Sequence, residues 1–185
     1  ASERLDNIVQ NLLAMTRLES GLIKPRRDWT DMRDVVHSCL AKVGKELAGH
    51  TVEINISPSL PLVKLDFALF EQVLVNLLRN AALHTQADSS ITVNADAEGK
   101  ECLVTIEDNG PGFPPDSLKN VFEKFYRVPG SKTGGIGLGL SIAQGFVLAH
   151  GGTLTVENLP QGGAKFTIRL PLETGVRPNA EAADE

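Results

Sequence analysis

Apolar side chains recur at helical spacing in several stretches of the chain, and four long helices are predicted. The clearest begins after Asp66, whose side chain is suited to cap the first turn. The other three are predicted over residues 2–18, 31–48 and 138–150. One face of the helix after Asp66 is apolar throughout and carries Phe70, Val73, Leu74, Leu77, Leu78 and Ala81.

Shorter segments with alternating or continuous apolar residues predict strands. These strands are predicted over residues 51–56, 60–65, 90–97, 102–108, 153–157 and 164–170. A hairpin turn at residues 98–100, Glu-Gly-Lys, joins the third and fourth of them. Residues 24–30 are expected to be extended, and a short helix is expected after Pro115. Residues 127–137 are rich in Gly, Ser, Lys and Thr without periodicity, which predicts a mobile loop.

The two ends of the chain differ in character. The helix over residues 2–18 has a stripe of Leu5, Val9, Leu12 and Leu13. Such a stripe either binds a partner or packs on its own domain, and the sequence favours neither. Residues 173–185 hold four acids with Pro and Ala, so this segment is predicted to be a disordered acidic tail.

Composition limits the class of protein. A chain of 185 residues that is 42% hydrophobic can bury one core. A formal net charge of -5 argues against nucleic acid as a partner, because such binding needs a concentrated cationic surface. Cys39 and Cys102 fit no metal-ligand spacing and are expected to be free thiols in a reducing compartment. No apolar run reaches the ~18 residues that span a bilayer, so a cytoplasmic domain is expected.

The helix after Asp66 also has a polar face. Gln72, Asn76 and Asn80 lie one turn apart on it. Asn80 offers the neutral oxygen that suits Mg²⁺, an ion that also keeps waters and phosphate oxygens as ligands. Asn76 can orient a phosphate or complete the metal shell. Taken alone, the two asparagines could equally be a buried structural pair.

Residues 108–112, Asp-Asn-Gly-Pro-Gly, follow a predicted strand. The carboxylate of Asp108 can accept a hydrogen bond from the exocyclic amine of adenine, which guanine does not offer. Gly110 and Gly112 let the backbone come close to a flat ligand. Taken alone, the motif is also common turn chemistry.

Residues 135–140, Gly-Ile-Gly-Leu-Gly-Leu, open a predicted helix. Backbone amides and the helix dipole make such a terminus suitable for a polyphosphate. The motif lacks the Gly-Lys-Ser/Thr ending of a Walker A loop. Lys124, Arg127 and Lys132 could reach phosphates or could be solvated surface charges. Phe122 and Phe125 could anchor the base of the loop.

In chain order there are four motifs: the asparagine pair, residues 108–112, the phenylalanine pair and residues 135–140. They resemble the N, G1, F and G2 boxes of the ATP-binding catalytic domain of bacterial sensor histidine kinases. That domain has the Bergerat-type fold shared by Hsp90, gyrase B and MutL. The resemblance covers roughly residues 29–172, and residues 12–21 resemble the end of the second dimerisation helix. It implies an α/β (α+β) two-layer sandwich, with a mixed sheet, helices on one face and ATP beneath a flexible lid. The chain would then divide into residues 1–21, 22–172 and 173–185.

The resemblance also implies roles for individual residues. Asn76 and Asn80 would serve phosphate and Mg²⁺, and Asp108 would read adenine. Further ATP contacts would come from His84, Phe122, Phe125, Tyr126, Arg127, Leu138, Leu140 and the glycines Gly110, Gly112, Gly135, Gly137 and Gly139. The ATPase branch of the fold has Glu where this chain has Asn76, and asparagine is no general base. Phosphoryl transfer to a histidine of a dimerisation domain, and then to a response-regulator aspartate, is therefore favoured over hydrolysis.

Two departures from the family pattern leave alternatives open. The usual phosphate-binding lysine is replaced by Leu83. None of His37, His50, His84 or His150 lies in a phosphoacceptor motif, so the acceptor must lie elsewhere. A degenerate nucleotide-binding module and an ATPase are the alternatives. Segments 15–21, 48–50 and 162–166 look most like potassium- and turgor-related sensor kinases, which implies a membrane-anchored homodimeric parent. The fragment itself is expected to be monomeric.

Overall fold

The computed structural model describes residues 2–131 and 135–173, with side chains from residue 5 onward. In this part of the chain a mixed sheet of five strands has the order β2-β4-β5-β7-β6. β2 runs parallel to β4, and the other neighbours are antiparallel. The strands are β2 (Thr51–Ile56), β4 (Ser90–Glu98), β5 (Glu101–Asp108), β6 (Thr153–Asn158) and β7 (Ala164–Pro171).

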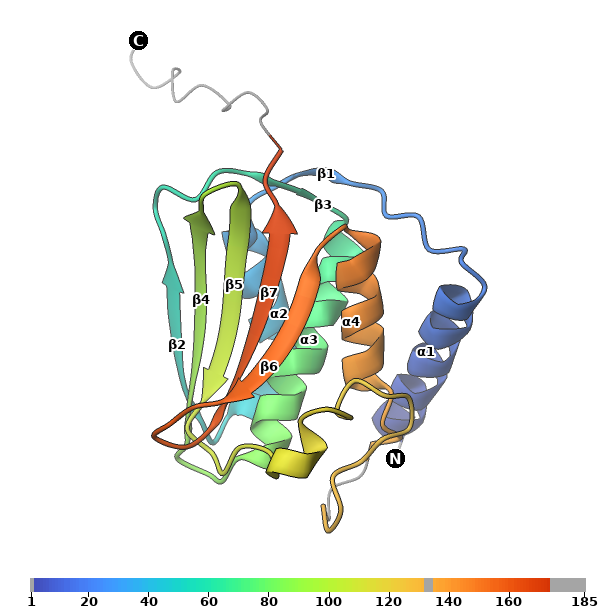
Figure 1. Ribbon diagram of the computed structural model, residues 1–185, viewed down its shortest axis with the longest axis vertical. Helices are drawn as coiled ribbons and strands as arrows, with labels where there is room; N and C mark the ends of the chain where they lie inside the picture. The colour runs from blue at the N-terminus through green and yellow to red at the C-terminus, as the bar shows by residue number, and fades with distance from the viewer. Residues whose placement is uncertain (1, 132–134, 174–185) are drawn as a thin grey trace.

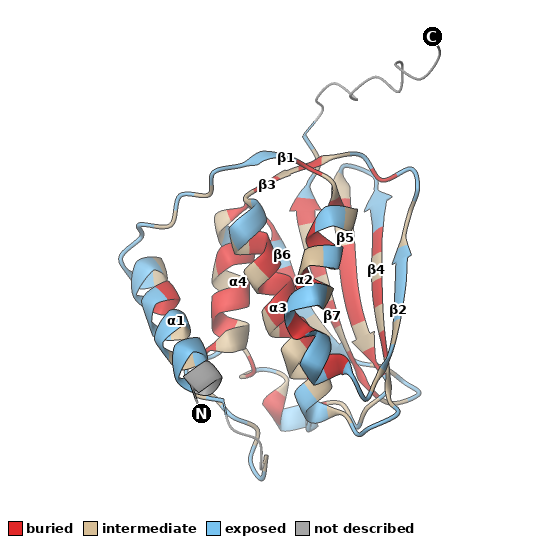
Figure 2. Cartoon of the chain, turned by 180° about the vertical axis from the view of Figure 1, so that it is seen from behind, coloured by how far each residue is buried: buried red, intermediate tan, exposed pale blue. Residues whose placement is uncertain are grey.

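One face of this sheet is covered by α2 (Met32–Leu47), α3 (Phe67–His84) and α4 (Gly139–Ala149), as Figure 1 shows. The core lies between the two layers, where buried residues alternate along β4, β5 and β7 and line the inner helix faces (Figure 2). The two-layer α/β fold expected from the sequence is confirmed. The strands at 51–56, 90–97, 102–108, 153–157 and 164–170 are confirmed to within a few residues, and the helix at 115 is the single turn η1 (Pro115–Ser117).

The predicted strand over residues 60–65 is wrong in extent. The observed strand β3 is only Val63–Leu65, and it pairs with β1 (Asp28–Thr30) in a separate two-stranded sheet. Pro58 and Pro61 lack the backbone N–H that a sheet ladder needs, which explains the late start of the strand.

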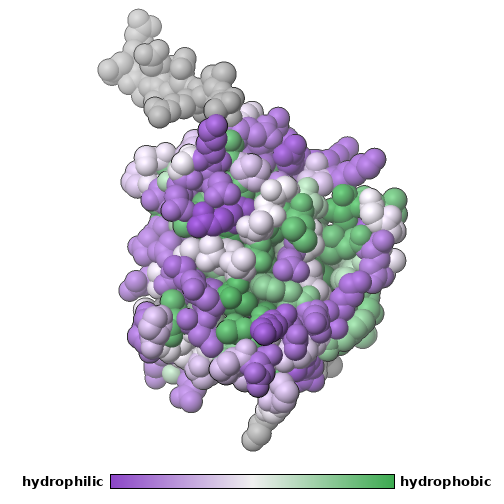
Figure 3. Space-filling model, viewed as in Figure 1, coloured by the Kyte–Doolittle hydropathy of each residue, from purple (hydrophilic) through white to green (hydrophobic). Residues whose placement is uncertain are grey.

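The N-terminal helix α1 (Ser2–Glu19) packs on α4 with a narrow part of its surface. Ala14 and Met15 are buried, and Leu18 lies so close to Gly145 that a Cβ there would be 2.8 Å from Leu18 Cδ1. The stripe of Leu5, Val9, Leu12 and Leu13 stays exposed. Figure 3 shows apolar surface on the side of the molecule where α1 and α4 lie. The helix therefore packs on its own domain with one face, and a partner for the exposed stripe stays a prediction.

The helical layer contains a buried carboxylate that is paired. Glu71 of α3 is buried and accepts hydrogen bonds from Ser38 and Lys42 of α2.

Cys39 and Cys102 are buried and free, as expected, and burial raises the pKa of each thiol to about 12. The described helices include none that is long and apolar enough to cross a membrane.

His150 connects the end of α4 to the start of α3. Its Nδ1 lies 2.7 Å from Phe146 O, and its Nε2 accepts the Asp66 backbone N–H at 3.0 Å. The ring is therefore neutral, with the proton on Nδ1. Burial lowers the pKa of His150, partly opposed by the bond to Phe146 and by Asp66.

Acid is expected to weaken the fold through His150. Its pKa is lowered in the folded state, so the unfolded chain binds the proton first as the pH falls below about 6.5. Between the unfolded and the folded pKa, stability falls by up to about 1.4 kcal/mol per pH unit. Urea unfolding of His150→Gln at about pH 7.5 and about pH 5.5 should therefore show a smaller loss than the wild type.

The exposed His37 provides the matched control, because His37→Gln removes a titrating ring from the same domain without touching this contact. An unchanged pH dependence in His150→Gln would contradict the assignment of the neutral ring.

Candidate functional site

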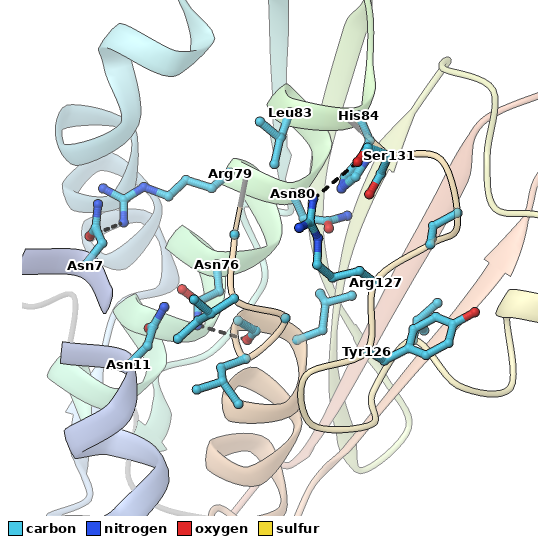
Figure 4. Close-up of a pocket in the computed structure, with 18 of the residues that line it drawn as sticks. Asn7, Asn11, Asn76, Arg79, Asn80, Leu83, His84, Tyr126, Arg127 and Ser131 are labelled. Carbon is cyan, nitrogen blue, oxygen red and sulfur yellow. Dashed lines mark hydrogen bonds between the residues drawn. The ribbon is translucent and has the colours of Figure 1, made fainter. Parts of the chain in front are cut away.

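A cavity of about 610 Å³ lies between α3, the amino end of α4 and the loop that leads into α4. Figure 4 shows its polar side chains. It is lined by Asn7, Ile8, Asn11, Glu46, Asn76, Arg79, Asn80, Ala82, Leu83, His84, Phe113, Val121, Tyr126, Arg127, Val128, Ser131, Gly135, Ile136, Gly137, Leu138, Gly139 and Leu140. Ten of the fifteen predicted contact residues are thus brought together: Asn76, Asn80, His84, Tyr126, Arg127, Gly135, Gly137, Leu138, Gly139 and Leu140.

The paired asparagines of α3 line the cavity at its helical wall. The Nδ2 of Asn76 donates to Gly139 O at 3.0 Å, which ties α3 to the first residue of α4 and leaves the Asn76 oxygen available. The Asn80 amide makes no side-chain hydrogen bond within the described residues. The two carboxamide oxygens are therefore free to accept hydrogen bonds or to bind a cation.

The loop before α4 is pinned at its two ends. Phe125 N donates to Gly137 O at 2.9 Å, and Phe125 has a positive φ of 62°, which is unusual for a residue with a Cβ. Gly137 has φ 76°, and a Cβ there would lie 2.7 Å from Tyr126 O. Only glycine fits this close approach, which holds the cavity-lining residues before α4 against Phe125 and Tyr126.

Asp108 lies at the end of β5, where it is buried with 8% of its surface exposed. Its Oδ1 accepts the N–H groups of Gly110 at 2.9 Å and Ala164 at 3.3 Å. Oδ2 has no hydrogen-bond partner within the described residues. Burial raises the pKa of Asp108, and the two backbone N–H groups and His84 oppose that rise.

The glycine turn after Asp108 is fixed by residues that the sequence did not indicate. Asn158 accepts the Phe113 N–H at 2.8 Å and donates to Phe113 O at 2.7 Å. A Cβ on Gly112 would lie 2.7 Å from Asn158 Oδ1. A Cβ on Gly163 would lie only 1.8 Å from Asp108 O. These contacts join two turns that are far apart in the sequence. A single sequence carries no signal that links one turn to the other.

His84 is the last residue of α3 and lies on the cavity wall. Burial of its ring lowers the pKa of His84, Asp108 opposes this, and Arg127 adds to it. The cavity wall therefore carries a neutral imidazole that feels the charges of Asp108 and Arg127.

Several predicted contacts lie outside the cavity wall. Asp108, Gly110 and Gly112 form the turn beyond His84 and do not line the cavity, and neither do the two phenylalanines. Phe122 packs edge-on against Phe166, with 6.5 Å between ring centroids, and Phe125 is exposed. Phe122 therefore fits the alternative in which a core phenylalanine anchors the base of the loop. The exposed side chain of Phe125 does not, and Phe125 holds the loop through its backbone N–H.

The sequence analysis also considered Lys124 and Lys132 as possible phosphate contacts. Lys124 is paired with Glu19 of α1 at 2.5 Å and does not line the cavity. Lys132 lies outside the described residues. His50 is half-buried and bonds through Nε2 to Thr85 Oγ1 at 2.8 Å.

The residues present fit a magnesium ion only in the company of phosphates. Among the described residues there is no group of three or more His, Cys, Asp or Glu that could enclose a metal. The oxygens of Asn76 and Asn80 are neutral donors of the kind that Mg²⁺ accepts when phosphates complete its shell.

The helices on one face of a mixed sheet, with paired asparagines facing a glycine-bounded helix start, define the Bergerat class of nucleotide-binding folds. The chain belongs to the family described as histidine kinase-, DNA gyrase B-, and HSP90-like ATPases, whose sequence model matches residues 66–174.

Curated relatives of this chain are sensor kinases. The sensor protein KdpD of Escherichia coli strain K12 is 39% identical over 170 residues, which is 90% of this chain and 19% of that protein. The signal transduction histidine-protein kinase AfsQ2 of Streptomyces coelicolor is 36% identical over 173 residues, 92% of this chain and 31% of that protein. This chain therefore spans about a fifth to a third of the length of these two relatives.

A solved structure of full-length ShkA in complex with AMPPNP has a TM-score of 0.82 and 26% identity. The match covers 95% of this chain and 37% of that one. The similarity to KdpD agrees with the resemblance of segments 15–21, 48–50 and 162–166 noted from the sequence.

Proposed function

We propose that this chain is the ATP-binding catalytic domain of a sensor histidine kinase, which transfers the γ-phosphoryl group of Mg-ATP to a histidine on a dimerisation domain. The observation that carries this proposal is the cavity, where the amides of Asn76 and Asn80 face the glycine-bounded start of α4. Triphosphate would lie against these groups, because helix-terminal N–H groups favour anions. Adenine would lie at the far end, with its amine donating to Asp108 Oδ2.

Transfer is favoured over hydrolysis by the charges in the cavity. Within the described wall, the one carboxylate is Glu46, which is paired with Arg79 at 3.0 Å. Asn76 cannot take a proton from water. The described wall therefore offers no free carboxylate to activate water, and phosphoryl transfer depends on holding the donor in line with an acceptor.

Each side chain then has a defined task. Asn80, with Asn76, would hold Mg²⁺, which supplies charge neutralisation on the phosphates when bound. Arg79 and Arg127 line the cavity and would add positive charge near the phosphates. Phe122 and Phe125 would set the base of the loop, and Gly135, Gly137 and Gly139 would let its backbone approach the ligand.

The larger assembly belongs to the same proposal. We propose that the domain works at the cytoplasmic face of a longer, membrane-anchored homodimer. Phosphate would pass through the histidine of the dimerisation domain to a response regulator. The divisions 1–21, 22–172 and 173–185 follow from this assignment, with α1 as part of a dimerisation helix, and residues 174–185 lie outside the described structure. The isolated chain would be monomeric.

Calorimetric titration with a non-hydrolysable ATP analogue, with and without Mg²⁺, tests binding. Micromolar affinity, roughly -8 kcal/mol, that weakens without Mg²⁺ is expected. Labelled ATP with a separate dimerisation segment containing the acceptor histidine then tests transfer. Binding without labelled phosphohistidine would favour a degenerate module, and steady phosphate release from the chain alone would favour an ATPase.

The degenerate alternative rests on Leu83, which is 46% exposed on the cavity wall where related kinases have lysine. Replacing Leu83 by lysine is expected to strengthen binding of the ATP analogue by about 1 kcal/mol, roughly fivefold, because an ammonium group would meet phosphate at a partly solvated site. Leu83→Gln is the matched control, since it removes the apolar side chain without adding charge. Equal affinities of the two variants would show that no phosphate lies near residue 83.

A further inference from the structure

The helix α1 supplies part of the cavity wall. Asn7, Ile8 and Asn11 line it together with residues of α3 and of the loop. Asn7 and Asn11 are one turn apart and share a face of α1 with the buried Ala14 and Met15. Figure 4 shows both amides on α1, across the cavity from α3. A ligand in this cavity would therefore contact α1 as well as α3 and the loop.

The two amides differ in their bonding. Asn7 Oδ1 accepts from Arg79 Nη1 at 3.1 Å, and Arg79 Nε is paired with Glu46 of α2 at 3.0 Å. Arg79 thus connects α1 to α2 and faces the cavity. The half-buried Asn11 amide makes no hydrogen bond with any described residue. Its N–H groups are free donors on the wall opposite Asn76.

We infer that Asn11, directly, and Asn7, through Arg79, bind the phosphate chain of the nucleotide, so that occupancy of the cavity tightens the docking of α1 on the domain. This inference rests on the proposed function. Free amide donors and a guanidinium match the oxygens of a polyphosphate.

The contact between α1 and the domain is of a kind that ligand binding can strengthen. Its apolar part is small, and four large apolar side chains of the helix remain exposed. Its polar contacts are Asn7 with Arg79 and Glu19 with Lys124, and both partners lie at the cavity or at the base of its loop. A ligand that adds contacts to α1 must stabilise the docked helix, and by reciprocity the docked helix must strengthen ligand binding.

Calorimetry on the full chain tests this with two ligands, a non-hydrolysable ATP analogue and adenosine. Asn11→Ala is expected to weaken the analogue by about three- to tenfold and Asn7→Ala by about two- to fivefold, because each loses a hydrogen bond to phosphate or its positioning. Adenosine affinity should stay unchanged in both. Gln10→Ala is the matched control, since Gln10 is exposed on the same helix and does not line the cavity.

Hydrogen exchange provides a second readout that a merely structural role would not move. The analogue should slow amide exchange in α1 of the wild type, and less so in Asn11→Ala. Failure of the wild type to bind any nucleotide would refute the proposed function itself. Tight binding by the wild type with unchanged affinity in both variants, or an equal loss for adenosine and the analogue, would overturn the role of α1 alone.

Discussion

Replacing Asp108 by asparagine is expected to weaken binding of an ATP analogue by about 10- to 150-fold, which corresponds to the roughly 1.5–3 kcal/mol of a charged hydrogen bond. The reason lies in how the carboxylate is held. Oδ1 accepts two backbone N–H groups, from Gly110 and Ala164, so the amide oxygen of asparagine must take that place. The new NH₂ group then replaces Oδ2 and meets the adenine amine, donor against donor.

The same variant should lose its preference for adenine over guanine, because guanine presents a carbonyl where adenine presents the amine. Titration with non-hydrolysable analogues of ATP and GTP measures both effects. Asp116→Asn, an exposed acid in the nearby turn of helix, is the matched control. Wild-type affinity and wild-type selectivity in Asp108→Asn would refute the assignment of Asp108 to adenine.

Replacing Gly163 by alanine is expected to cost more than about 4 kcal/mol of folding free energy, or roughly 8–16 °C in Tm. The added Cβ would lie 1.8 Å from Asp108 O, and the turn would have to move away from β5. Gly163 also has φ 101°, which disfavours any side chain. Because the displaced carbonyl belongs to Asp108, ATP binding should be lost with stability.

Replacing Gly162 by alanine separates the effect of the positive φ from the effect of the contact with Asp108 O. Gly162 has a similar φ of 99°, but its Cβ would lie 3.6 Å from Gly110 O, an ordinary contact. Gly162→Ala should therefore cost only the backbone strain, about 1–3 kcal/mol. Thermal unfolding of both variants measures the difference. If Gly163→Ala were no less stable than Gly162→Ala, the tight contact with Asp108 would be wrong.

The features that could be predicted from the sequence are those set by residues close together in the chain. The long helices follow from apolar spacing, and the start of α3 follows from Asp66, which accepts Leu69 N at 3.2 Å as its cap. The ordered motifs on α3, at the end of β5 and at the start of α4 were sufficient for the resemblance that implied the fold. Asn76 and Asn80 do line one cavity with the glycine loop.

Contacts between remote segments could not be predicted. Asn158 holds the turn at Phe113 from 45 residues away, and Glu19 holds Lys124 from 105 residues away. No periodicity or cap marks such a partner in one sequence. The place of β3 was missed for the same reason, because its partner β1 lies on the far side of α2 in the chain.

The pairing of β1 with β3 has a consequence for the N-terminal helix. Together with the Arg26 N–H, which donates to Asp66 Oδ2 at 2.8 Å, it anchors the chain from Arg26 onward, so α1 is attached through residues 20–25 (Figure 1). A connector of that length reaches roughly 20 Å when extended. A helix that leaves α4 would remain at a roughly millimolar effective concentration near its binding face. Detachment and return are then a unimolecular exchange, whose position will not change when the protein is diluted.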